Sequence, residues 1–209
     1  MALMKFTLKA RDRVIAALFG TALAAGFVTA GSSPAQAQFI CVGNATGALV
    51  PPGAADGGGA TATGATALAC GPGANAVGAG TTVVGANAGT GAAPTNSSNS
   101  AFGFNAGQNV NGPANTALGV NSGQNVTGAT NIAIGSLAGG TVNGSANTGI
   151  GVLSGSNVNG TVNTAVGNAA GNHVTGIANV ALGLNTGQNV NGSSNIGQGN
   201  RVKRSVTNA

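Results

Sequence analysis

The residues that could carry out chemistry are few in this chain of 209 residues, and they are widely spaced. It has one histidine, His173, two cysteines, Cys41 and Cys70, and one carboxylate outside the N-terminal region, Asp56. Two cysteines and one histidine are too few for a zinc site. No carboxylate pair is available for glycoside hydrolysis, and no Ser-His-Asp set is available either. The sequence therefore predicts no catalytic residue, no metal site, no cofactor and no small-molecule substrate, and we expect the chain not to be an enzyme.

The formal net charge of +5 is concentrated at the two ends of the chain. Most of the Lys and Arg residues lie at or before Arg13, and the remaining ones are Arg201, Lys203 and Arg204. Between Asn99 and Ser194 there is no Lys, Arg, Asp or Glu at all. Nucleic-acid binding needs cations along the contact surface, so it is excluded as a function. Residues 200–209 are interpreted as a basic, solvated tail or neck.

Residues 1–37 have the pattern of a secretory signal peptide. A basic start is followed by an apolar run, Val14–Ala30, and by a small-x-small cleavage site, Ala35-Gln36-Ala37. The mature chain is expected to begin at Gln38 and to be exported, either to the cell surface or into the medium. The apolar run could also be an uncleaved anchor, but the cleavage site favours removal.

The residues that follow divide into three segments before the tail. Residues 38–70 are rich in Gly, Ala, Pro and Thr, and Cys41 and Cys70 are expected to form a disulfide that closes this segment in an oxidising compartment. Residues 71–98 are predicted to form irregular early coils and a loop, Ala92–Ser98. Residues 99–199 contain the regular repeats.

A 16-residue period runs without interruption from Asn99 to Ser194, and we number its places from one to sixteen. Asparagine occupies place one, glycine occupies places five, nine and fourteen, and valine occupies place twelve in every unit. Such strict spacing indicates that each unit is one turn of a solenoid. The six complete units begin at Asn99, Asn115, Asn131, Asn147, Asn163 and Asn179.

A unit of this length is too short for a helical hairpin, but it suffices for two short strands and two turns. One strand is predicted within Asn115–Gly119 and its equivalents, and a second around the place-twelve valine, as in Gln124–Thr127. The sequence therefore predicts an all-β, parallel β-solenoid or β-roll of 16-residue coils.

The asparagines of place one and the valines of place twelve are predicted to form internal ladders along the solenoid. A sugar-binding or ice-binding row is the alternative for the asparagines, and turn chemistry favours the structural role. His173 stands at place eleven, where most units have asparagine, and it is interpreted as a replacement in a polar ladder. The predicted ladder residues are Asn115, Asn131, Asn147, Asn163, Asn179, Val126, Val142, Val158, Val174 and Val190.

Several apolar residues lie outside the most regular apolar places, and some of them should face outward. Apolar rows that repeat along a rod favour packing of several rods side by side, although scattered apolar surface residues are also common. These residues are Val120, Leu137, Val152, Leu153, Ile177 and Leu184.

Units such as Asn163–Gly167 and Asn131–Gly135 resemble the head repeats of YadA-like trimeric autotransporter adhesins. The resemblance covers about residues 71–199. It implies a left-handed parallel β-roll, a homotrimer, and display on the outer membrane of Gram-negative bacteria. It also implies binding to host cells, to matrix proteins or to other copies of the chain. The family's heptad stalk and four-strand membrane anchor are not found after Gly199, so a truncated head or a secreted head are both expected possibilities.

The leading functional hypothesis is a non-enzymatic adhesin head that mediates attachment to cells, matrix or other bacteria. Its repeated polar surface of Asn, Gln and Thr would sum many weak contacts. A secreted structural rod or matrix component without a specific ligand is the alternative. Ice binding is disfavoured by the irregular residue types at place two, and an enzyme is disfavoured by the missing carboxylates.

Overall fold

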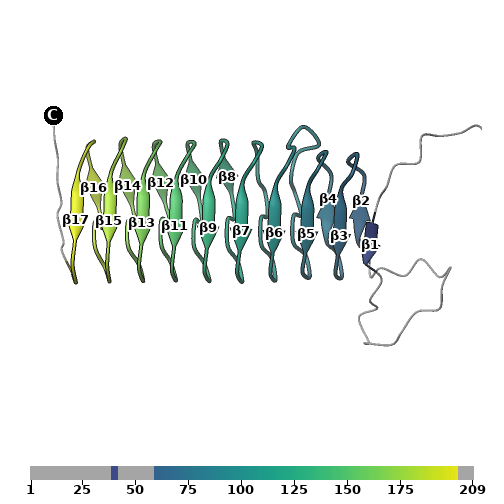
Figure 1. Cartoon of the computed structure of the whole chain (residues 1–209), viewed down its shortest axis with the longest axis horizontal. Coiled ribbons are helices and arrows are strands. Elements are labelled where there is room, and N and C mark those ends of the chain that lie inside the picture. The colour runs from purple at the N-terminus through teal and green to yellow at the C-terminus, as the bar shows by residue number, and fades with distance from the viewer. Residues whose placement is uncertain (1–38, 42–58, 202–209) are drawn as a thin grey trace, which may run out of the picture. The chain divides into compact units, whose positions relative to one another are not determined.

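The structure of the chain is a computed structural model that describes residues 39–41 and 59–201. It is all-β, and its parallel strands form a β-solenoid of about nine turns (Figure 1). This confirms the solenoid predicted from the 16-residue period. The predicted signal peptide and nearly all of the basic tail lie outside the described residues.

The larger sheet contains ten strands within the described residues, and from residue 68 onward each successive coil supplies one of them. All of its neighbouring strands are parallel, so each of these coils returns to the same side before it contributes its next strand. The strands, in spatial order, are β1 (Phe39–Cys41), β3 (Leu68–Cys70), β5 (Thr82–Val84), β6 (Ser100–Phe102), β7 (Thr116–Leu118), β9 (Ile132–Ile134), β11 (Thr148–Ile150), β13 (Thr164–Val166), β15 (Val180–Leu182) and β17 (Ile196–Gln198).

Two smaller sheets lie behind the ten-stranded sheet in the view of Figure 1. A two-stranded sheet pairs β2 (Thr61–Ala62) with β4 (Asn75–Ala76). A five-stranded sheet carries the place-twelve valines and consists of β8 (Val126–Thr127), β10 (Val142–Asn143), β12 (Val158–Asn159), β14 (Val174–Thr175) and β16 (Val190–Asn191).

The strand register shows that the coils differ in length along the chain. Thr116 pairs with Ile132, one full period further on, and the later coils keep this spacing. Leu68 pairs with Thr82 across a coil shorter than the period, whereas Thr82 pairs with Ser100 across a coil longer than the period. The longer coil contains the loop that was predicted at residues 92–98. The solenoid also extends further toward the N-terminus than its sequence pattern indicates, because the short coils of β2 and β3 do not keep the period.

Asn96 in this loop connects the irregular coils to the regular ones. Its side chain is buried; its carbonyl oxygen accepts a hydrogen bond from the Gly112 amide at 2.8 Å, and its amide donates to the Val110 carbonyl. The Thr81 hydroxyl donates to the Asn96 backbone carbonyl at 3.3 Å. Asn96 thus pairs backbone groups of the coil before β8, to which no earlier strand of the five-stranded sheet is bonded. Fewer buried backbone groups are therefore left without a hydrogen-bond partner there.

The core is thin and consists mostly of small side chains. Alanine or glycine at place three and valine at place twelve point inward from the two sheets, and glycine at place nine lies beneath the alanine. A Cβ atom on Gly139 would lie 2.6 Å from the Cβ atom of Ala133. Gly139 also has a φ of 58°, a left-handed conformation that favours glycine. Two separate constraints therefore fix glycine at this place.

We expect Gly139→Ala to lower the free energy of unfolding by at least about 2 kcal/mol, because it combines overpacking with backbone strain. Gly140→Ala is the matched control, since the nearest atom to a Cβ there lies 3.7 Å away and its φ is not positive. That control should stay within about 0.5 kcal/mol of the unaltered chain. Urea unfolding monitored by circular dichroism measures both variants, and equal losses would contradict the packing argument.

Candidate functional site

The place-one asparagines form a continuous buried ladder inside the solenoid. The Asn147 side-chain amide donates to Asn131 Oδ1 at 3.1 Å and to the Gly160 carbonyl at 2.9 Å. In turn, Asn147 Oδ1 accepts hydrogen bonds from the backbone amide and from the side-chain amide of Asn163, both at 3.0 Å. The same pattern repeats in neighbouring coils, and the ladder asparagines are buried. Their burial leaves no surface on which a sugar or ice could contact this row.

The place-twelve valines form a second buried row, which packs as one cluster from Val110 to Val190. Between this row and the ladder lies an interior cavity of about 60 Å³ lined by asparagine, alanine, glycine and valine. Ligand pockets are typically about 300–1,000 Å³. The interior is therefore packing space, and any partner has to be contacted by the outer surface.

The two cysteines are register partners at the N-terminal end of the ten-stranded sheet. Cys41 in β1 pairs with Cys70 in β3. Neighbouring strands lie about 4.8 Å apart, which falls within the Cα separation of about 4.4–6.8 Å that a disulfide spans. The register is compatible with the predicted disulfide, which stays a prediction.

His173 occupies place eleven, and its side chain is exposed on the side of the coil that carries the five-stranded sheet. Within the described residues, no group of three or more His, Cys, Asp or Glu side chains is placed to hold a metal ion. In the same residues, no helix has the length and hydropathy needed to cross a membrane.

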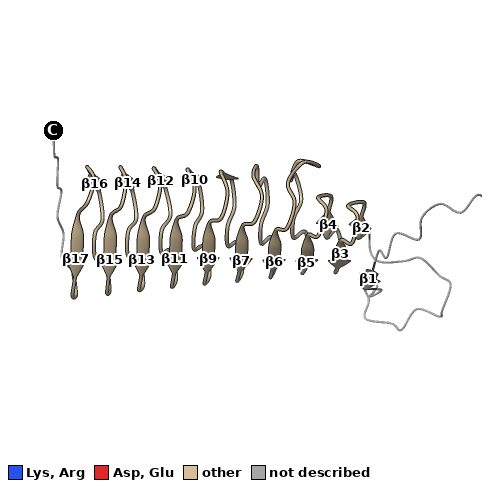
Figure 2. Cartoon of the chain, turned by 45° about the horizontal axis from the view of Figure 1, so that its top comes forward, with Lys and Arg blue, Asp and Glu red and all other residues tan. Residues whose placement is uncertain are grey.

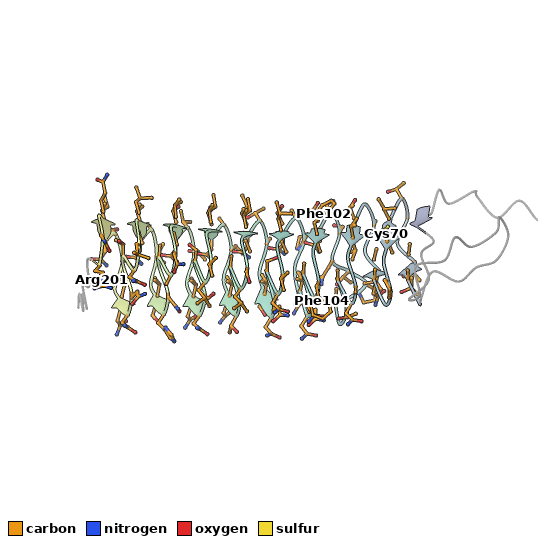
Figure 3. All side chains as sticks on the ribbon, turned by 90° about the horizontal axis from the view of Figure 1, so that it is seen from below. Cys70, Phe102, Phe104 and Arg201 are labelled. Carbon is orange, nitrogen blue, oxygen red and sulfur yellow. The ribbon has the colours of Figure 1, made fainter. Side chains whose placement is uncertain are left out.

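An apolar face covers the outer side of the ten-stranded sheet. We define it as the side chains at place four of each coil; together with the mostly hydroxyl side chains of place two, they point away from the interior because the side chains of a strand alternate. Phe102 is 39% exposed, Leu118 46% and Ile150 38%, and in Figure 3 most side chains on this side end in carbon. Its place-four members are Val84, Phe102, Leu118, Ile134, Ile150, Val166 and Leu182.

Of the six apolar residues outside the regular apolar places, some were expected to face outward, and all six are exposed. They occupy corner positions of the coils, at places six, seven and fifteen, and their exposed fractions lie between 38% and 52%. They extend the apolar surface beyond the strands of the ten-stranded sheet. These residues are Val120, Leu137, Val152, Leu153, Ile177 and Leu184.

An uncharged amide face lies on the other side of the coils. We define it as places eleven and thirteen, which flank the inward-pointing valine of the five-stranded sheet and are exposed in every complete unit. Nitrogen and oxygen atoms tip the side chains on this side in Figure 3. Its members are Asn109, Asn111, Asn125, Thr127, Thr141, Asn143, Asn157, Asn159, His173, Thr175, Asn189 and Asn191.

The backbone explains one of these two rows but not the other. Place eleven has a φ between 52° and 62° in all six units, including 60° at His173. Asparagine is enriched in this left-handed region, so its presence at place eleven follows from the turn. Place thirteen lies in or next to a strand and shows no positive φ. Asparagine is depleted in strands, and the period alone did not separate this row from the asparagines that the turns require.

Neither face contains a Lys, Arg, Asp or Glu residue. Figure 2 shows no Lys, Arg, Asp or Glu on the coils between β2 and β17, and Arg201 is the one such residue within the described ranges. Comparison with known proteins returns no match: no protein-family model, no curated protein and no solved structure corresponds to this chain. The two faces and the resemblance of the repeats are therefore the features of the chain that bear on its function.

We expect Asn147→Ala to reduce the free energy of unfolding by about 3 kcal/mol, because it leaves the Asn163 amide and the Gly160 carbonyl without their buried partners. Asn143→Ala removes the same side chain from the exposed amide face and should cost less than about 0.5 kcal/mol. Thermal and urea unfolding of both variants provide the measurement. A similar loss in both would show that the buried ladder has no special role in stability.

If Cys41 and Cys70 form the predicted disulfide, thiol titration of the unfolded, unreduced chain will find no reactive cysteine. Closing a loop of about 30 residues is worth about 3.5 kcal/mol in the chain-entropy estimate. Reduction should therefore destabilise the chain by an amount of this order, and a Cys41→Ser/Cys70→Ser variant should not respond to reductant. Two titratable thiols in the oxidised sample would disprove the pairing.

Proposed function

We propose that this chain is the non-enzymatic head of an adhesin, exported to the cell surface or the medium, and that it acts as a homotrimer. The observation that carries the proposal is the division of one solenoid into an apolar face and an uncharged amide face. The signal-peptide pattern supports export, and the resemblance to YadA-like heads supports three chains, a left-handed coil and an outer-membrane location.

The apolar face supports association with other copies of the chain. Covering a half-exposed Leu or Ile side chain gains on the order of 1 kcal/mol. The place-four row repeats this gain over seven successive coils, from Val84 to Leu182. The sum is comparable to the cost of association, which is several kcal/mol or more. Packing these faces together would leave the amide faces directed outward.

The outward amide faces support binding to cells, matrix proteins or other bacteria. Three parallel heads would present the same polar pattern three times, and multivalency can raise a weak affinity by several orders of magnitude. A secreted structural rod would share the fold and the assembly but would have no saturable ligand. Binding therefore separates the two hypotheses, and assembly alone does not.

For residues 38–209, we expect light scattering after size exclusion to give three times the mass of one chain. Ile150→Asp should dissociate the trimer, since it would bury an unpaired charge in the contact. Asn143→Asp is the control, because it adds the same charge to the exposed amide face, which the proposed contact leaves uncovered. A folded monomer, or equal dissociation of both variants, would contradict the assembly.

The same preparations test the adhesin function directly. The trimer should bind cultured cells or immobilised matrix proteins saturably, and the Ile150→Asp monomer should bind at least about tenfold more weakly because it loses multivalency. Absence of saturable binding by a well-folded trimer would reject the adhesin and favour the structural rod.

A further inference from the structure

The requirements of the fold do not explain why asparagine is common at place thirteen. This row contains only Asn and Thr, and its backbone is extended. Thr127 and Thr175 show that threonine, a better strand former, is compatible with the position. Asn143 and Asn159 nevertheless place exposed amides in strands β10 and β12. The amide groups are therefore better explained by what they present to the exterior than by strand formation.

The amide face is partly ordered by hydrogen bonds that run from coil to coil. The Asn109 side chain donates to Asn125 Oδ1 at 3.0 Å, and that of Asn143 donates to Asn159 Oδ1 at 3.3 Å. A primary amide has two N–H groups and two acceptor lone pairs, and a ladder contact uses one donor of one residue and one acceptor of the next. Each such amide keeps further donor and acceptor capacity. Holding the side chains in rows lowers the entropy cost of ordering them in a complex.

The absence of fixed charge on the face limits the chemistry of a partner. A polyanion or a strongly acidic peptide would find no Lys or Arg there, and a cation would find no carboxylate. Burying a charge without an opposite charge is unfavourable. The groups that match the face are neutral ones that both donate and accept hydrogen bonds, and hydroxyl groups are the simplest of these.

The size of the face favours a slender partner. Six coils at about 4.8 Å each give a length of about 28 Å, and two side-chain rows give a width of roughly 12 Å. The resulting strip, on the order of 340 Å², is less than half of the roughly 800 Å² that each partner buries in a standard protein–protein interface. A globular protein would cover too little of its own surface there, whereas a linear polymer would fit the strip along its length.

We propose that the amide face binds a linear, neutral polysaccharide that lies along the solenoid axis. An extended chain of six-membered sugar rings advances by about one coil spacing per sugar, so its hydroxyl groups can meet equivalent amides in successive coils. The inference rests on the proposed adhesin function and gives its ligand class. The face contains no Phe, Tyr or Trp on which sugar rings could stack, so the affinity of one face is low and the response depends on repeated heads.

The test uses the full chain and immobilised oligosaccharides of four neutral linear types: β-1,4-glucan, β-1,3-glucan, α-1,4-glucan and β-1,4-linked N-acetylglucosamine. A sulfated glycan is included for comparison. We expect saturable binding to at least one neutral type, no binding to the sulfated one, and little change between low and high salt because no ion pair is involved.

A triple variant, Thr127→Ala/Asn143→Ala/Asn159→Ala, removes three exposed side chains from adjacent coils of the face. It should bind the glycan at least about tenfold more weakly, since each lost hydrogen bond contributes modestly and the losses add. The control variant Thr130→Ala/Asn168→Ala/Ser194→Ala removes three exposed polar side chains that lie outside both faces. It should retain binding. Unfolding curves confirm that both variants are folded.

Each other outcome overturns the inference in a distinguishable way. Saturable binding to cells without binding to any of the four neutral glycans rejects the ligand class but leaves the adhesin function standing. Glycan binding that is equal in both triple variants places the site elsewhere. Arrest of ice growth that only the first triple variant loses would assign the face to ice, and loss of all saturable binding in a folded chain would reject the adhesin function as well.

Discussion

Consecutive coils approach each other so closely at two corners that no side chain fits between them. A Cβ atom on Gly144 would lie 1.9 Å from the carbonyl oxygen of Gly160, and one on Gly119 would lie 2.6 Å from that of Gly135. These corners also need a positive φ that glycine adopts without strain. Each corner has to meet the same corner of the next coil, so one inserted residue would misalign the corners of its own coil with those of the two neighbouring coils. The strict period follows from this constraint. Extra residues occur in the longer coil between β5 and β6, where Asn96 of the loop accepts a hydrogen bond from the next coil.

The same close approach limits what can stabilise the solenoid. Coils this narrow accommodate alanine, glycine and valine inside, and these side chains bury little apolar surface. Hydrogen bonds in the parallel strands and in the asparagine ladder therefore contribute a larger share of the solenoid's stability than they do in a protein with a large apolar core. Within the described residues, every buried side-chain nitrogen or oxygen has a hydrogen-bond partner. A buried amide row is stabilising only when it is fully satisfied, and exact repetition of the coil is what gives each asparagine the same partners.

The sequence was sufficient to predict the regular coils, because glycine, valine and asparagine recur where geometry demands them. It was not sufficient for the coil of β2 and β3, since a shorter coil keeps the fold but loses the period. It also could not separate the asparagines of places eleven and thirteen, which look alike in the chain. Their difference lies in φ, which is positive at Asn157 and not at Asn159. Outward apolar residues such as Val152 could be anticipated from their irregular places, but the amide face could not be delimited.

The two faces have opposite consequences for the solenoid. Exposed rows of Leu, Ile and Val promote association, and an unguarded apolar face would promote it with any partner. In the proposed trimer, closed assembly would cover this face and leave no apolar face for further growth. The amide face has neither apolar rows nor Lys, Arg, Asp or Glu side chains, so water can hydrate it and it does not attract ions. Its individual contacts are weak, because a hydrogen bond to a partner replaces one to water. Selectivity on such a surface has to come from matching a repeat over many coils, and a solenoid can supply that match because its coils are identical in spacing.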